Sequence, residues 1–125
     1  MRALIIDDST AMRVLLRRML NEEGYEVLEA KNGREAIECL KTHGTPDIAL
    51  VDWNMPEMNG LDFVRAVRRE LGERQVLLMM VTTESETSQM VRALAAGANE
   101  YLMKPFTKEA LLEKLAMLGS GPVHA

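Results

Sequence analysis

Four apolar runs of the chain are each followed by polar residues whose chemistry suits phosphate. Asp7 and Asp8 follow the first run, Asp52 follows another, Thr82 follows a third, and Lys104 follows the last. Carboxylates that lie together need a cation, and an all-oxygen set suits Mg²⁺. A carboxylate can be the nucleophile in phosphoryl transfer, and a lysine can pair with phosphoryl oxygens. If these residues meet, Asp52 is the expected phospho-acceptor, Asp7 and Asp8 are metal ligands, and Thr82 and Lys104 bind the phosphoryl group.

The alternation of apolar runs with helical stripes predicts how these residues are brought together. Short apolar runs indicate strands at 3–6, 25–30, 48–51, 76–81 and 101–103, and apolar spacings of three and four indicate helices around 12–20, 36–40, 61–67, 90–95 and 110–118. Strands that alternate with helices predict a three-layer, doubly wound α/β fold, (βα)5, with the flavodoxin-like parallel strand order 2-1-3-4-5. The carboxyl ends of parallel strands share one edge, so the polar residues should meet there.

Size and composition fit one globular domain. The chain has 125 residues, of which 47% are apolar and 27% charged, and its formal net charge is −4. We expect the domain to span residues 1–118, with a tail at 119–125 that is either a flexible terminus or a cut linker. The acidic balance disfavours nucleic acid as a partner, and no apolar run reaches the ~18 residues that cross a membrane. The single cysteine, Cys39, is typical of a cytoplasmic protein. Separately, we expect the protein to be a monomer.

The same positions carry a family resemblance. The pair Asp7-Asp8, Asp52 with the following WNMPEMNG, the VTT that contains Thr82, and Lys104-Pro105 resemble the receiver domain of bacterial response regulators, from residue 1 to about residue 118. The segments DWNMP at 52–56 and KPFT at 104–107 are similar to those of the single-domain chemotaxis members. The resemblance implies a cytoplasmic two-component signalling protein whose partner is a histidine kinase. It implies a switch that promotes its own phosphorylation and dephosphorylation and is not a classical enzyme.

The resemblance also assigns roles to individual residues. It implies that Asp52 receives the phosphoryl group, as the residue types already indicate. The implied Mg²⁺ ligands are the side chains of Asp7, Asp8 and Asp52 and the backbone carbonyl of Asn54. The family usually has a cis peptide bond before the residue that matches Pro105, which would direct the preceding lysine into the crevice.

A switch mechanism follows from the same resemblance. Phosphorylation would draw the hydroxyl of Thr82 inward, and Tyr101 would turn from an exposed to a buried position. The surface of the fourth helix, fifth strand and fifth helix would then change, and this output face would bind the protein target, which in chemotaxis would be the flagellar motor switch. The residues expected on the output face are Tyr101, Met103, Phe106 and Lys114.

Two residues near the acceptor are expected to tune the lifetime of the phosphoryl group. Asn54 and Glu84 each lie two positions beyond a key residue and, by the resemblance, flank the water that hydrolyses the phosphoryl bond. Trp53, which follows the acceptor directly, is expected at the rim of the crevice.

The sequence leaves other functions open. A receiver can also be a phosphorelay intermediate, a phosphate sink or a modulator of its kinase. A small flavodoxin-like cofactor binder belongs to a different class, and it would need a phosphate-binding loop after the first strand. Ser9 and Thr10 lie there, but the two acids before them oppose a flavin phosphate. A DNA-binding regulator without its second domain is a further alternative, because the tail is compatible with a severed linker.

Overall fold

The computed structural model describes residues 1–119, which form a five-stranded parallel sheet flanked by helices. The strand order β2-β1-β3-β4-β5 and the α/β class are those predicted. In chain order the elements are β1 (Arg2–Ile6), α1 (Thr10–Glu22), β2 (Glu26–Ala30), α2 (Gly33–His43), β3 (Ile48–Val51), α3 (Gly60–Arg65), the π-helical η1 (Ala66–Glu70), β4 (Leu77–Thr82), α4 (Thr87–Ala96), β5 (Glu100–Met103) and α5 (Lys108–Met117). Positions 120–125 of the predicted tail lie outside the described residues.

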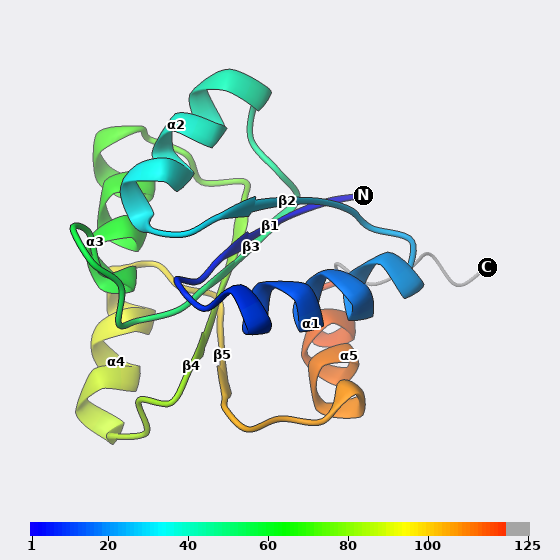
Figure 1. The fold of residues 1–125 in the computed structure, drawn as a ribbon. Helices are drawn as coiled ribbons and strands as arrows, with labels where there is room; N and C mark the ends of the chain where they lie inside the picture. The colour runs from blue at the N-terminus through cyan, green and yellow to red at the C-terminus, as the bar shows by residue number, and fades with distance from the viewer. Residues whose placement is uncertain (120–125) are drawn as a thin grey trace.

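Helices cover both faces of the sheet. α2, α3 and α4 lie on one face, and α1 and α5 lie on the other (Figure 1). Successive strand residues point to opposite faces, so β4 contributes Leu78 and Met80 to one apolar core and Met79 and Val81 to the other. A sheet buried on both sides has apolar residues at consecutive positions, which is why its strands are visible in the sequence as continuous apolar runs.

Polar side chains cap the N-termini of α1 and α3, the helices that follow the two strands leading to the acids. The Ser9 hydroxyl accepts a hydrogen bond from the Met12 N–H at 3.2 Å, and the Asn59 side chain accepts one from the Asp62 N–H at 2.8 Å. Each cap satisfies an N–H group that the first turn of a helix leaves unpaired. Because β1 ends at residue 6 and α1 begins at residue 10, the first two acids lie in a very short connection and are held at the sheet edge.

α4 faces the sheet with the side that contains Ala93, and its larger apolar residues point away from the sheet. Ala93 is its buried residue, whereas Val91 and Leu94 are 58% and 47% exposed. Met90 and Ala96 pack against the same core as Ala93. Each residue turns a helix by about 100°, so positions three apart share a side, and the line through residues 90, 93 and 96 faces the sheet. The larger apolar side chains are thus left on the surface.

The helices are short, and the third one widens at its end. α1, the longest in the described part of the chain, has 13 residues. The N–H of Leu71 donates to the carbonyl of Ala66 at 3.0 Å, five residues back, where the sequence spacing predicted a regular helix. None of the helices within residues 1–119 has the length and apolar character needed to cross a bilayer.

Candidate functional site

Three carboxylates meet at the carboxyl edge of the sheet. Asp7 and Asp8 follow β1, Asp52 follows β3, and one carboxylate oxygen of each lies within 4.8 Å of the other two. The N–H of Asp52 donates to the carbonyl of Ile6 at 2.9 Å, which extends the pairing of β1 with β3 up to the acids. Asp7 and Asp52 are buried and Asp8 is exposed, so the cluster opens to solvent beside Asp8.

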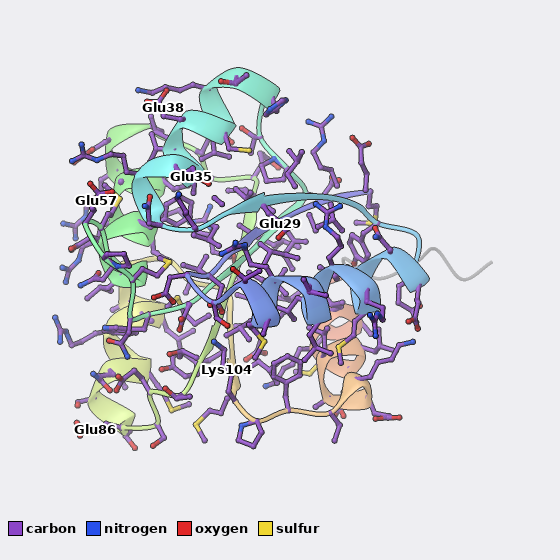
Figure 2. The ribbon with its side chains drawn as sticks, viewed as in Figure 1. Glu29, Glu35, Glu38, Glu57, Glu86 and Lys104 are labelled. Atoms are coloured by element: carbon purple, nitrogen blue, oxygen red, sulfur yellow. The ribbon has the colours of Figure 1, made fainter. Side chains whose placement is uncertain are left out.

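Hydrogen bonds fix the Asp7 side chain and backbone. One carboxylate oxygen accepts from the Ser9 N–H at 2.9 Å, and the other accepts from the Lys104 ammonium at 2.8 Å. The backbone carbonyl accepts from the Arg13 guanidinium at 2.6 Å. Arg13 is itself paired at 3.1 Å with Glu29 of β2, which is labelled in Figure 2. The position of Asp7 is therefore set by contacts from β2, α1 and the segment after β5.

Lys104, which is labelled in Figure 2, places a positive charge beside the carboxylates of Asp7 and Asp52. Its ammonium lies 2.8 Å from a carboxylate oxygen of Asp7 and 3.6 Å from one of Asp52. The backbone N–H of Lys104 donates to the backbone carbonyl of Thr82 at 2.9 Å, and this bond joins the ends of β4 and β5. The peptide bond between Lys104 and Pro105 is cis. A lysine between two buried carboxylates offsets part of their mutual repulsion.

The surroundings of Asp52 oppose its ionised form. Burial is the largest cause and raises the pKa of the Asp52 carboxyl above its ordinary value, while the Lys104 ammonium acts in the opposite direction. The carboxylate of Asp7 raises the pKa further, and hydrogen bonding from the Thr82 hydroxyl and the Trp53 N–H lowers it. An added cation beside Asp52 would therefore be favoured, because it would stabilise the ionised carboxylate.

The donor chemistry of the cluster fits Mg²⁺. All three side chains offer carboxylate oxygens. Within residues 1–119, no histidine or cysteine belongs to this cluster. Mg²⁺ takes such oxygens, normally from one or two carboxylates, and keeps several waters or phosphate oxygens in its remaining positions. The exposed position of Asp8 gives these additional ligands access from solvent.

Two loops are joined across the rim of the crevice. The Asn54 side-chain amide donates to the Glu84 carboxylate at 2.6 Å, which links the β3–α3 loop to the β4–α4 loop. Thr82 is fully buried, and its hydroxyl oxygen accepts from the Glu84 N–H at 3.3 Å. The Tyr101 hydroxyl donates to the Glu84 carbonyl at 2.6 Å. Thr82, Glu84 and Tyr101 are therefore one hydrogen-bonded unit, which we call the switch unit.

Tyr101 points inward, which is the buried one of the two positions predicted for it. Its side chain is 5% exposed, and burial, followed by the nearby Glu84 carboxylate, raises the pKa of its hydroxyl. The bond to the Glu84 carbonyl satisfies the polar end of the ring, which allows the ring to be buried. Of the other residues predicted on the output face, Met103 is exposed, and Phe106 and Lys114 are half-buried.

Gly60 lies against the backbone of Asp52, a contact that was not predicted from the sequence. A Cβ at this position would lie 2.2 Å from the backbone carbonyl oxygen of Asp52. The Gly60 N–H donates to the Trp53 carbonyl at 2.8 Å, so the start of α3 lies directly against the acceptor segment. The sequence signal is the pair Asn59-Gly60, which is typical of a turn and gives no indication of what the glycine approaches.

Two other residues near the site also differ from expectation. Trp53 is buried in the core beneath α2, α3 and α4, where a large apolar ring is favourable, and does not line the rim. Arg13 donates to the backbone carbonyl of Asp7, a contact that was not predicted from the sequence. A side chain that bonds to a distant backbone carbonyl leaves no periodic signal in the sequence.

A doubly wound parallel sheet with three acids and a lysine at its carboxyl edge defines an α/β domain suited to Mg²⁺ and phosphate. The sequence matches the response regulator receiver domain over residues 3–116. The chain therefore belongs to the response regulator receiver domain family.

The chain is similar in length and fold to several known proteins. It is 44% identical over 119 residues to chemotaxis protein CheY1 of Helicobacter pylori, covering 94% of this chain and 96% of that protein. It is 39% identical over 116 residues to chemotaxis protein CheY of Pseudomonas aeruginosa, covering 92% and 93%. The solved structure of chemotaxis protein CheY4 of Vibrio cholerae has a TM-score of 0.86 and 36% identity, covering 93% of this chain and 96% of that chain.

Proposed function

We propose that this protein is a phosphorylation-dependent switch in which Asp52 receives a phosphoryl group from a histidine kinase. The observation that carries the proposal is the trio of carboxylates with the Lys104 ammonium between Asp7 and Asp52. Membership of the receiver family supports the same chemistry. The protein would act in the cytoplasm as a monomeric signalling component.

In the proposed reaction, a carboxylate oxygen of Asp52 attacks the phosphorus of a phosphohistidine. A P–O bond forms as the P–N bond breaks, and the electron pair stays on the imidazole nitrogen, which takes up a proton. When bound, Mg²⁺ supplies positive charge to the phosphoryl oxygens. The residues that would hold it are Asp7, Asp8, Asp52 and, through its backbone carbonyl, Asn54. Lys104 would pair with a phosphoryl oxygen in place of its present carboxylate partners.

The proposed switch runs through the switch unit. The hydroxyl of Thr82 would donate to a phosphoryl oxygen, and the Glu84 N–H that now bonds to it would move with the β4–α4 loop. Tyr101 would respond because its own hydroxyl is bonded to the Glu84 carbonyl. A shift from 1:99 to 99:1 between two conformations requires about 5.5 kcal/mol of differential stabilisation. Asn54 and Glu84, joined over the acceptor, would control access of the hydrolytic water.

The names of the relatives support a role in chemotaxis. We propose that the output face formed by α4, β5 and α5 binds a protein target there, such as the flagellar motor switch. Val91, Leu94 and Met103 are exposed apolar residues on this face and offer contact area. Comparison of target binding with and without a phosphoryl mimic tests this output, and equal binding in both states would contradict it.

Incubation with acetyl phosphate and Mg²⁺ tests the acceptor directly. We expect intact-mass measurement to show one acid-labile phosphoryl group per chain, and none in Asp52→Asn or in the presence of EDTA. Asp62→Asn is the matched control, because it removes an exposed carboxylate on α3 and should be labelled like the wild type. Acid-stable labelling, or full labelling of Asp52→Asn, would contradict the proposal.

A further inference from the structure

A second polar site lies at the opposite edge of the sheet, where β4 and β5 begin. A cavity of about 400 Å³ opens between η1, the segment that leads into β4, and the turn between α4 and β5. α3 and α4 are neighbours on the same face of the sheet (Figure 1). The residues that line the cavity are Arg68, Arg69, Arg74, Ala96, Gly97 and Asn99. Three of these residues are arginines, and none is acidic.

Arg68 is fixed in place at the base of this cavity. Its guanidinium donates to the carbonyls of Gly97 and Glu73, each at 3.0 Å, and to the side-chain oxygen of Asn99 at 2.8 Å. The same Asn99 oxygen accepts from the N–H of Leu78 at 2.8 Å, which anchors it to β4. A Cβ at Gly97 would lie 2.6 Å from the Arg68 Cγ, so the absent side chain provides the space that Arg68 occupies.

Arg69 and Arg74 are exposed, and neither forms a hydrogen bond or ion pair through its side chain within residues 1–119. Burial is the main cause that lowers the pKa of Arg68; the Glu73 carboxylate raises it, and the charge of Arg74 lowers it. The charge of Arg74 thus acts on Arg68, and the side chains of Arg69 and Arg74 remain available to a ligand.

We propose that this cavity, the arginine pocket, binds a small phosphorylated anion with at least two negative charges, such as the pyrophosphate group of a nucleotide. Guanidinium groups match phosphate oxygens with two parallel hydrogen bonds, and three of them can neutralise a multiply charged anion. The volume lies at the lower end of the roughly 300–1,000 Å³ typical of small-molecule sites. The formal net charge of −4 favours a small ligand over nucleic acid, which needs a more extended basic surface.

The arginine pocket is separate from the acceptor crevice. β4 runs from Leu77, near the pocket, to Thr82 in the crevice, and its 6 residues span about 17 Å at about 3.3 Å per residue. Binding in the pocket therefore requires neither Mg²⁺ nor Asp52, and it can be measured without the proposed phosphorylation chemistry.

Calorimetric titration with inorganic pyrophosphate in EDTA tests the proposal. EDTA removes divalent metal ions. A metal ion bound at the carboxylates would attract pyrophosphate to that site instead. We expect saturable binding to the wild type and at least tenfold weaker binding to the double variant Arg69→Gln/Arg74→Gln. Both replaced side chains are exposed, so the double variant should unfold at the wild-type temperature. The matched control is Arg34→Gln/Arg92→Gln, which removes the same charge from exposed positions outside the pocket and should bind like the wild type.

Amide NMR shifts on titration locate the ligand. We expect the largest shifts at Gly97 and Asn99 and none at Asp8. Titration with ADP identifies the source of the phosphate: tighter binding of ADP than of pyrophosphate indicates a nucleotide, equal binding indicates free pyrophosphate, and either result supports the pocket. Absence of saturable binding at millimolar pyrophosphate, equal weakening in the control variant, or shifts confined to the carboxylates would overturn the proposal.

Discussion

An acidic cluster lies at one edge of the sheet and an arginine cluster at the other, and their charges are balanced differently. At the carboxyl edge Asp7 and Asp52 are buried, and the Lys104 ammonium lies 2.8 and 3.6 Å from their oxygens. At the amino edge Arg69 and Arg74 are exposed and unpaired within the described residues. Buried charge is costly without a partner, whereas exposed charge is stabilised by water. The carboxyl edge therefore contains its own counter-charge, and the amino edge can take one from solution.

The largest expected effect is on the free energy of unfolding, and it should differ between substitutions of Gly60 at the carboxyl edge and Gly97 at the amino edge. Gly60→Ala places a Cβ 2.2 Å from the Asp52 carbonyl oxygen, a backbone atom that cannot yield without moving the acceptor. We expect a loss of about 3 kcal/mol in the free energy of unfolding. Gly97→Ala meets the flexible Arg68 side chain at 2.6 Å, with a backbone φ of +121°, and should cost about 1–2 kcal/mol. Urea unfolding measures both, and a larger loss at Gly97 would contradict the comparison.

Removal of the internal cation should make the carboxyl edge more dependent on metal. Lys104→Met keeps a long side chain but leaves the carboxylates without the ammonium that competes with Mg²⁺. We expect Mg²⁺ to bind about tenfold more tightly, or ~1.4 kcal/mol, within the ~1–4 kcal/mol of a charge pair at about 4 Å. Lys41→Met, at an exposed position on α2, is the control for calorimetry. Unchanged Mg²⁺ affinity in Lys104→Met would show that the lysine does not oppose the metal.

The pH dependence of stability should report the burial of the acceptor. The pKa of the Asp52 carboxyl is raised above its ordinary 3.8, so between the two values the folded protein binds more protons than the unfolded chain. Stability therefore falls as pH rises through this window. In EDTA, Asp52→Asn should gain stability relative to the wild type as pH rises above the ordinary carboxyl pKa of 3.8, and Mg²⁺ should reduce the difference.

Urea unfolding across this pH range is the measurement. Asp62→Asn, whose carboxylate is exposed, should show no such trend. A stability difference between Asp52→Asn and the wild type that stays constant with pH would mean that the acceptor is not destabilised by burial.

The smallest expected effect on stability is at the rim. Asn54→Ala removes the bond to Glu84, and because Asn54 is exposed the loss should be below about 1 kcal/mol. The rate of phosphoryl transfer to Asp52 should stay the same while the rate of phosphoryl loss changes, because the Asn54 side chain bonds to Glu84 and lies outside the carboxylate cluster. Glu86→Ala, at an exposed position on the β4–α4 loop (Figure 2), is the control. An unchanged phosphoryl lifetime in Asn54→Ala would exclude the rim as a determinant.

The acidic cluster could be predicted from the sequence because each member directly follows an apolar run. Asp7, Asp8 and Asp52 needed only the rule that parallel strands end at a common edge. Gly60 could not be predicted in the same way, since its role depends on the distance to a backbone atom of another segment. The contact of Arg13 with Asp7 was missed for a similar reason, because it is made to a backbone carbonyl.

The arginine pocket and the exposed side of α4 illustrate a second limit. Nothing in the sequence joins Arg68 and Arg69 to Gly97 and Asn99. Val91 is exposed because α4 turns Ala93 toward the sheet. Both features depend on how one helix is rotated and placed against another element.

The sequence by itself determined the strand order and the identity of the acidic cluster, because hydrophobic periodicity and chain order are local properties. Tertiary structure alone decided that Tyr101 is buried against the Glu84 carbonyl, that Gly60 supports the acceptor, and that three arginines share a cavity with Gly97. Each of these depends on distances between segments far apart in the chain, which are set by packing of the whole domain.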